Sequence, residues 1–237
     1  DSVTMCDRKG VIYRGRDNVD QWKSAHAVDT GARTLEEALA GADVFLGLSA
    51  AGALKPAWVE KMAKQPIIFA MANPDPEITP DDAKAVRPDA IVATGRSDYP
   101  NQVNNVLGFP FIFRGALDVG ATTINEAMKL AAVHAIADLA TAESSDIVVK
   151  AYGRDQSFAF GPDYLIPKPF DPRLIVQIAP AVAKAAMDSG VATRPIADLA
   201  AYRASLSNFV FRTGFAMRPI FERARANPLR VVYAEGE

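Results

Sequence analysis

The sequence predicts an α/β fold in which a doubly wound parallel sheet, lacking its first βα unit, is followed by a helical extension. Three observations predict it. Apolar runs of four or five residues alternate with capped helices up to about residue 95, and the pattern after residue 104 is helical. Small or polar residues follow the runs, as in sheets that bind ligands beyond the carboxyl ends of their strands. Short, uninterrupted apolar runs are typical of parallel strands covered on both faces.

The elements of the first part follow from local signals. Thr34 precedes a short helix and has Glu37 three residues later, the spacing of a capping box. Pro56–Ala63 is predicted as a helix because proline is tolerated in the first turn, and Thr79 caps a further helix. The strands are expected at the apolar runs between these helices, over Val3–Cys6, Val11–Tyr13, Val44–Leu48, Ile67–Met71 and Ala90–Ala93.

Helices dominate the second part. The apolar segment Asn105–Asp118 is expected to be buried, and Thr123 is expected to cap a long helix that ends near Glu143. A further helix is expected over Arg173–Ser189 and ends at Gly190. The remaining elements are helices over Ala197–Ser205 and Asn208–Asn227 and a final strand over Leu229–Ala234.

Composition excludes several classes of protein. The 237 residues include 23% charged side chains and carry a formal net charge of −2, which excludes a disordered chain and gives no basic footprint for nucleic acid. Cys6 is the single cysteine, so no disulfide can form within the chain, and a zinc site is not expected. The longest apolar stretch, Ala127–Ala142, is interrupted by charged residues. We therefore expect no membrane partner and a cytoplasmic location.

Asp7 indicates that the sheet begins upstream. In doubly wound nucleotide-binding sheets an acidic residue ends the second strand, about 20 residues after a glycine-rich loop. Counting back from Asp7 passes residue 1, and the chain contains no Gly-x-Gly. The chain is thus expected to be a fragment of a longer protein. An ordinary aspartate in a turn with Lys9 and Gly10 is an equally open interpretation.

Three further segments are candidate binding sites because they follow strands or begin a helix. Asn73 offers amide donors and an acceptor, although asparagine before proline also forms turns. Asn104 and Asn105 belong to a cluster of amides that exceeds the needs of one helix cap. Ser49 and Ala50 begin a small-residue loop that permits close approach of a ligand, or is a plain turn.

Other polar pairs have a structural interpretation. Glu36 with Glu37, and Asp81 with Asp82, follow a capping threonine, where acidic residues are favoured by the helix dipole. His134 and Asp138, four residues apart, are expected on a solvated helix face. No catalytic triad or set of metal ligands emerges from the sequence.

Three segments in the same order resemble the malic enzyme family. Residues 6–16 read CDRKGVIYRGR, residues 67–78 read IIFAMANPDPEI and residues 93–106 read ATGRSDYPNQVNNV. The resemblance is strongest for large bacterial, NADP-preferring members with a fused phosphotransacetylase-like domain. Residues 229–237, LRVVYAEGE, resemble the first strand of that domain.

The resemblance implies an organisation and a reaction. It implies an NAD(P)-binding, Rossmann-like domain over residues 1–143, a helical extension of the malic enzyme core over 144–205, and a linker helix with the first strand of the fused domain over 206–237. The complete protein would convert malate to pyruvate and CO2 while reducing NADP+ or NAD+, assisted by Mg2+ or Mn2+. The catalytic lysine and tyrosine and the metal ligands of the family fall upstream, so this chain alone is expected to be inactive.

The resemblance also assigns residues. It implies substrate contacts for Asn73, Asn104 and Asn105, and it implies a homo-oligomer with possible acetyl-CoA regulation through the fused domain. Lys23 would face the 2′-phosphate of NADP, although a surface lysine is an open alternative. The implied cofactor contacts are Asp7, Lys23, Ser49, Ala50 and Asn73.

Two other functions remain open at this point. One is a two-domain dehydrogenase that oxidises an amino acid or hydroxy acid without decarboxylation. The other is a non-catalytic nucleotide-binding regulatory module.

Overall fold

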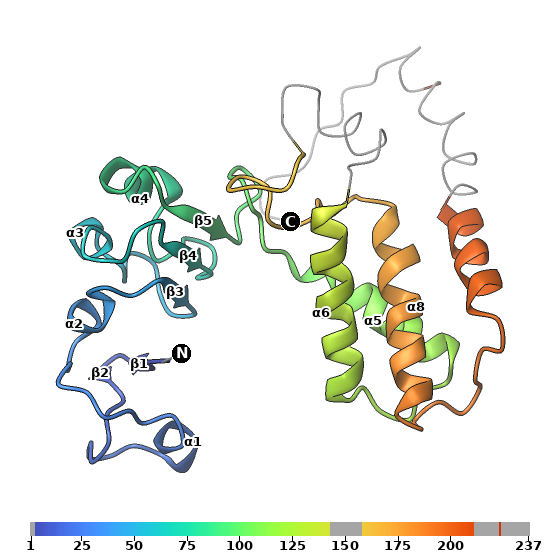
Figure 1. Ribbon diagram of the computed structural model, residues 1–237, viewed down its shortest axis with the longest axis horizontal. Coiled ribbons are helices and arrows are strands. Elements are labelled where there is room, and N and C mark those ends of the chain that lie inside the picture. The colour runs from blue at the N-terminus through green and yellow to red at the C-terminus, as the bar shows by residue number, and fades with distance from the viewer. Residues whose placement is uncertain (1–2, 143–157, 211–222, 224–237) are drawn as a thin grey trace, which may run out of the picture. The chain divides into compact units, whose positions relative to one another are not determined.

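The computed structural model describes residues 3–142, 158–210 and 223, which belong to two compact units (Figure 1). The N-terminal unit comprises residues 1–104 and 160–166, and the C-terminal unit comprises residues 105–159 and 167–237. The strand expected over Leu229–Ala234 lies outside the described residues, as does most of the helix expected over Asn208–Asn227.

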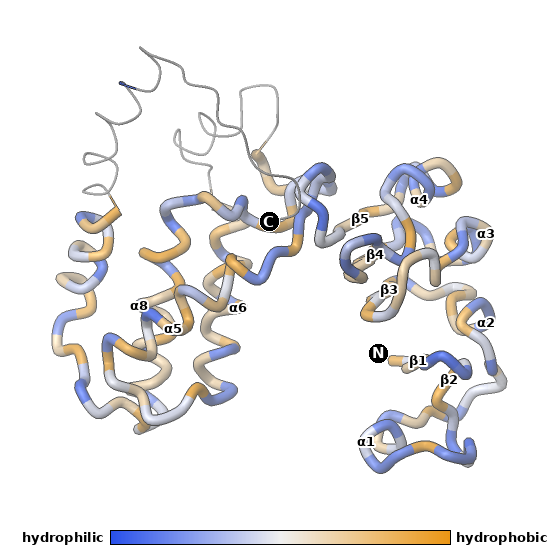
Figure 2. The backbone as a smooth tube through the Cα atoms, turned by 180° about the vertical axis from the view of Figure 1, so that it is seen from behind, coloured by the Kyte–Doolittle hydropathy of each residue, from blue (hydrophilic) through white to orange (hydrophobic). Residues whose placement is uncertain are grey.

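A parallel sheet of three strands forms the centre of the N-terminal unit. Its order is β3 (Val44–Gly47), β4 (Ile67–Ala70) and β5 (Ile91–Thr94), and Figure 2 shows hydrophobic colour along these strands. Each strand lies within one residue of the range expected from its apolar run. The parallel α/β architecture predicted from the sequence is therefore confirmed.

Three helices alternate with these strands; two begin at the predicted threonine caps, and the third begins at the expected Pro56. They are α2 (Leu35–Leu39), α3 (Pro56–Val59) and α4 (Pro80–Val86). The Thr34 hydroxyl accepts a hydrogen bond from Glu37 N, and the Glu37 carboxylate accepts one from Thr34 N, so the capping box is confirmed. Helix α3 ends four residues earlier than the expected Ala63.

The core of this unit lies on one face of the sheet. Phe45, Ile68 and Val92 are aligned across the three strands and pack with apolar side chains from α2, α3 and α4. On the other face Val44 and Leu46 are 53% and 62% exposed. The expectation that the strands are covered on both faces is wrong for β3, because no described element packs over the face that carries Val44 and Leu46.

The N-terminal residues form a separate hairpin. Strand β1 (Cys6–Asp7) pairs antiparallel with β2 (Gly10–Val11), and a short helix, α1 (Gln21–Ser24), follows. The expected strand Val3–Cys6 thus begins later and lies outside the parallel sheet. The chain reverses directly after Asp7, whose Oδ1 accepts a hydrogen bond from Lys9 N at 2.9 Å.

The C-terminal unit is helical. It contains the 3-10 helix η1 (Asn105–Leu107), helices α5 (Phe109–Asp118), α6 (Glu126–Thr141) and α8 (Arg173–Asp188), and a helix over residues 199–210. Both α5 and α6 pack on α8. No helix among the described residues is sufficiently long and apolar to span a membrane.

Two expectations for these helices are corrected. Helix α6 is capped by Asn125 instead of Thr123, because the Asn125 side chain accepts the hydrogen bond from Met128 N. Helix α5 is buried on one face alone: Phe109, Phe113 and Leu117 are each more than half exposed, whereas Gly115 and Ala116 are buried. The stop at Gly190 is confirmed by its φ of 73°, a conformation that glycine adopts without strain.

Candidate functional site

The carboxyl ends of the three parallel strands lie level with one another. Gly47 pairs with Ala70, and Ala70 pairs with Thr94, so the last residues of β3, β4 and β5 are in register. The three loops that follow therefore leave the sheet at one edge. In open α/β sheets this edge is where ligands bind, and the loops contain the predicted residues Ser49, Ala50 and Asn73.

The loops after β3 and β4 are joined by a buried carboxylate. Glu77 is completely buried and accepts hydrogen bonds from Ser49 N at 2.8 Å, Ser49 Oγ at 3.2 Å and Ala72 N at 2.9 Å. Backbone bonds from Gly52 N to Pro76 O and from Leu54 N to Glu77 O run between the same two loops. Sequence reasoning missed Glu77, although an acidic residue between two apolar neighbours was a usable signal.

The loops after β4 and β5 are linked by a more exposed ion pair. Arg96 lies 2.6 Å from Asp98 and 3.7 Å from Asp75, measured between side-chain nitrogen and oxygen. The guanidinium of Arg96 lowers the pKa of Asp98 by hydrogen bonding. The link between the two loops is the longer pair, Arg96 with Asp75, and both of its side chains are substantially exposed, so it contributes less to loop position than the buried Glu77.

Ser49, Ala50 and Asn73 are exposed on the loops that Glu77 joins. The backbone of Ser49 is fixed by Glu77, and Asn73 follows Ala72, whose N–H is bound by the same carboxylate. The three residues are thus exposed to solvent, on loops whose backbone is held in place by hydrogen bonds to Glu77. This arrangement suits contact with a bound ligand.

The amides near residue 104 have different roles. Asn101 is buried and donates to Val92 O and Pro162 O, while its Oδ1 accepts from Leu165 N. Asn104 is the last residue of the N-terminal unit before the chain enters the other, and Asn105 is exposed at the start of η1. The cluster therefore holds fewer ligand candidates than its composition indicated, because Asn101 is used within the fold.

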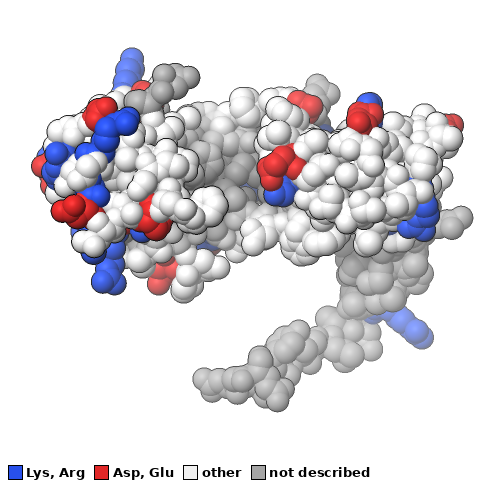
Figure 3. All heavy atoms as spheres, turned by 90° about the horizontal axis from the view of Figure 1, so that it is seen from below, with Lys and Arg blue, Asp and Glu red and all other residues white. Residues whose placement is uncertain are grey.

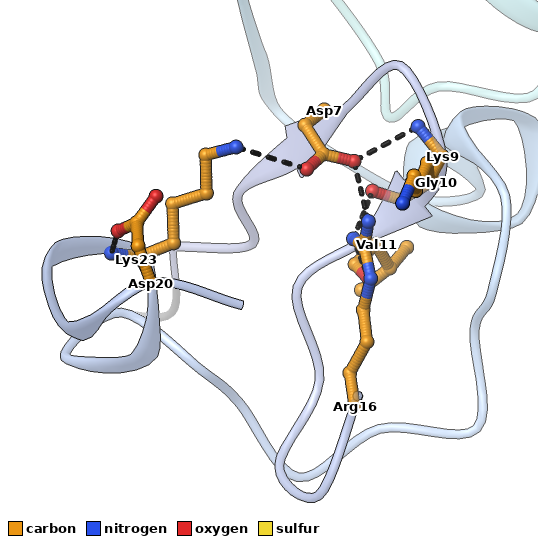
Figure 4. Close-up of polar contacts among 7 residues, drawn as sticks. All are labelled: Asp7, Lys9, Gly10, Val11, Arg16, Asp20 and Lys23. Atoms are coloured by element: carbon orange, nitrogen blue, oxygen red, sulfur yellow. Dashed lines mark hydrogen bonds and ion pairs between the residues drawn. The ribbon is translucent and has the colours of Figure 1, made fainter. Parts of the chain in front are cut away.

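Asp7 lies between two cations, as Figure 4 shows. Arg16 Nη2 donates to Asp7 Oδ1 at 2.7 Å, and Lys23 Nζ donates to Asp7 Oδ2 at 3.2 Å. Arg16 also donates to the carbonyl oxygens of Gly10 and Val11. The structure thus brings together two predicted residues, Asp7 and Lys23, and adds Arg16, which belongs to the segment that resembles the family but was not singled out.

The two cations differ in exposure. The side chain of Arg16 is 8% exposed, whereas that of Lys23 is 43% exposed. Hydrogen bonding from Arg16, aided by Lys9 N and Lys23, lowers the pKa of Asp7 to about 2. Asp7 is therefore ionised at neutral pH, and the three side chains together carry one surplus positive charge. On the face drawn in Figure 3, the cations of the N-terminal unit are otherwise interspersed with Asp and Glu.

The acidic pairs have the predicted structural roles. Glu37 completes the capping box of α2, and Glu36 pairs with Lys61 at the surface. Asp82 bonds to Thr79 at the start of α4 through both its N–H and its carboxylate. Within the described ranges, no three His, Cys, Asp or Glu residues gather as metal ligands.

The fold and the site together define an α/β domain with loops at the carboxyl edge of a parallel sheet, the edge where such sheets bind ligands. Residues 1–149 match the family model described as malic enzyme, NAD binding domain. The chain belongs to this family.

Curated relatives and solved structures agree with the family. The chain is 66% identical to the NADP-dependent malic enzyme of Salmonella typhimurium and 58% identical to the NAD-dependent malic enzyme of Rhizobium meliloti, and in both cases the alignment covers 100% of the chain and 31% of the relative. The chain thus spans about a third of the length of these relatives. The malic enzyme structure from Entamoeba histolytica aligns with a TM-score of 0.78 and 31% identity, covering 96% of this chain and 46% of that one.

Proposed function

We propose that this chain is the cofactor-binding part of a malic enzyme, which in its complete form converts malate to pyruvate and CO2 while reducing NADP+ or NAD+. The observation that carries the proposal is the level edge of the parallel sheet, where the loops after β3 and β4 are joined by Glu77. Two of the segments that resemble the family, residues 67–78 and 93–106, form loops at this edge. The match to the family model supports the same function.

The residues at this edge fit a dinucleotide. Ser49, Ala50 and Asn73 would contact the cofactor from the loops after β3 and β4, and Asp7 would lie on its adenosine side. When bound, NADP+ or NAD+ supplies the hydride acceptor. We propose NADP as the preferred cofactor because the surplus positive charge around Asp7 favours the added charge of a 2′-phosphate, and Lys23 is the more exposed cation.

Asn73, Asn104 and Asn105 are proposed to contact malate. Their amides donate hydrogen bonds to carboxylate oxygens without bringing a charge into the site. Mg2+ or Mn2+, with the catalytic lysine and tyrosine, would be supplied by parts of the protein outside this chain. Cytoplasmic location, a homo-oligomeric state and acetyl-CoA regulation through a fused domain remain predictions for the complete protein.

We also propose the domain division expected from the sequence: an NAD(P)-binding domain over residues 1–143, a helical extension over 144–205 and the start of a phosphotransacetylase-like domain over 206–237. The exposed row of Val44 and Leu46 on β3 and Leu48 directly after it supports a further βα unit. Such a unit would pair with the outer edge of β3 and cover this apolar row.

The experiment is a malate assay on the complete protein that contains this chain. Purified protein is given malate, NADP+ or NAD+ and Mn2+, and the reduced cofactor, pyruvate and CO2 are measured. We expect equal amounts of the three products and no reaction when the metal is chelated. Absence of cofactor reduction with any divalent metal would contradict the proposal. Reduction without CO2 release would instead favour a dehydrogenase that does not decarboxylate.

A further inference from the structure

Glu77 is an unusual buried group in the N-terminal unit. Its side chain is wholly removed from solvent, yet among the described residues no lysine or arginine forms an ion pair with it. Its three hydrogen bonds come from the backbone and side chain of Ser49 and from the backbone of Ala72. Burying a carboxylate is costly unless its oxygens accept hydrogen bonds. The three bonds therefore offset the cost of burying Glu77.

Both oxygens of the carboxylate are needed for this link. Oε1 accepts the two bonds from Ser49 after β3, and Oε2 accepts the bond from Ala72 after β4. A glutamine in the same place would turn an NH2 group toward one of the two backbone N–H groups, because an amide has one acceptor atom and one donor atom. A carboxylate can bind both loops at once, whereas a neutral amide can bind one.

The space around the carboxylate is also shaped for it. A Cβ atom at Gly47 would lie 2.5 Å from Glu77 Cδ and 2.6 Å from Oε1. These distances, and the 2.7 Å to Phe45 Cε1, are far shorter than a van der Waals contact, so any other residue at the end of β3 would crowd both the carboxylate and the Phe45 ring. Strand β3 therefore ends in the residue that leaves room for Glu77.

We propose that Glu77 is a positioning residue for cofactor binding, which fixes the loops after β3 and β4 in one arrangement so that Ser49 and Asn73 engage the dinucleotide together. This inference rests on the proposed function only in naming the dinucleotide as the ligand. Glu77 does not contact the ligand itself; it preorganises two loops that would otherwise lose freedom on binding.

The test measures binding of NADPH to the complete protein by calorimetric titration, without malate or metal. Glu77→Gln is expected to weaken NADPH binding by about ten-fold, the scale expected when a hydrogen bond to a charged group is lost. The matched control is Asp171→Asn, which also neutralises a buried carboxylate but in the C-terminal unit, where Asp171 is bound by Arg173. This control is expected to leave NADPH affinity within about two-fold, whatever its thermal stability.

A second variant disturbs the position of the Glu77 carboxylate without changing its charge. Gly47→Ala crowds the Glu77 carboxylate, and also the Phe45 ring, through the added Cβ, and should weaken NADPH binding as Glu77→Gln does. If Glu77→Gln fails to fold, the NADPH affinity of Gly47→Ala tests the proposal in its place. Wild-type affinity in either folded Glu77→Gln or folded Gly47→Ala would overturn the proposal, as would an equal loss in Asp171→Asn.

Amide hydrogen exchange separates this inference from the proposed function. Ser49 and Ala72 should lose amide protection in Glu77→Gln with no cofactor present, while the amides within α8 keep theirs. A parent protein that binds no dinucleotide would refute the proposed function, and unchanged protection of Ser49 and Ala72 would refute the role of Glu77.

Discussion

Asp7, Arg16 and Lys23 form a group of one acidic and two basic side chains, which we propose to lie at the adenosine end of the cofactor. Arg16 is nearly buried and also binds two backbone carbonyl oxygens, so its position is fixed by the hairpin. Lys23 makes one longer bond to Asp7 and is considerably more exposed. Of the two cations, Lys23 is therefore the one that can turn toward a phosphate while Arg16 keeps Asp7 neutralised.

Substitution of Lys23 tests this division of roles. Lys23→Ala in the complete protein is expected to raise the KM for NADP+ by about ten-fold, since a charge-assisted hydrogen bond to the 2′-phosphate is lost. The KM for NAD+, which lacks that phosphate, is expected to change by less than about two-fold. The measurement is initial rates of malate oxidation with each cofactor.

Lys9→Ala is the matched control for this prediction. Lys9 lies on the same hairpin, and its contact with Asp7 is through the backbone N–H, which the substitution retains. The ratio of the two KM values should stay that of the parent. An equal rise in both KM values for Lys23→Ala would show that Lys23 supports the fold of the hairpin and does not recognise the phosphate.

The residues of the site were predictable to the extent that they depend on strand ends. Ser49 and Asn73 were located because apolar runs end just before them and parallel strands share one carboxyl edge. Glu77 was not, because its role depends on hydrogen bonds from Ser49, which lies 28 residues earlier in the chain. Arg16 was not, because its role depends on how the chain folds back on Asp7 after the hairpin, which residue spacing does not indicate. Asn101 shows the converse: its amide appeared available for a ligand and is used by three backbone groups.

At the scale of elements, local signals located the strands β3 to β5 and the caps of α2 and α4. These depend on apolar runs and on side-chain bonds within one turn, which sequence spacing determines. Burial was less predictable. The apolar composition of α5 indicated a buried helix, but one face packs against α8 and the other exposes Phe109, Phe113 and Leu117. Composition alone does not say how many neighbours an apolar helix has.

The contact between α5 and α8 depends on a glycine. A Cβ at Gly115 would lie 2.4 Å from the carbonyl oxygen of Ala179 and 2.9 Å from Val182 Cβ, both on α8. Because the nearest atom belongs to helix backbone, it cannot move aside as a flexible side chain would. The close approach of the two helices therefore requires glycine at this position.

Gly115→Ala is expected to destabilise the packing of α5 on α8 by about 1–3 kcal/mol, the usual cost of overfilling a packed contact. Amide hydrogen exchange in α5 and α8 should become correspondingly faster. Gly108→Ala is the control, because its Cβ would meet only Ile112 Cδ1, at 3.8 Å. Wild-type exchange rates in Gly115→Ala would show that the helices separate without cost.

At the scale of the whole molecule, the chain accounts for one part of the proposed enzyme. It spans 31% of the Salmonella typhimurium relative. The residues that it contributes to the proposed site are mainly neutral amides and small side chains, with Asp7 and Lys23 at the adenosine end. In the proposal these groups bind and orient a cofactor and a substrate. The resemblance implies that the catalytic lysine and tyrosine lie upstream, so the proposal assigns proton transfer to other parts of the protein.

The final prediction follows from this division. The 237-residue chain, expressed alone, is expected to reduce no NADP+ or NAD+ with malate and Mn2+, whereas the complete protein does so under the same conditions. Circular dichroism would first establish that the isolated chain contains its helices, so that inactivity is not the result of unfolding. The complete protein carrying Asn104→Ala and Asn105→Ala gives the companion measurement, in which malate turnover should fall because two proposed substrate contacts are lost. Turnover of malate by the isolated, folded chain would show instead that the catalytic groups lie within these residues.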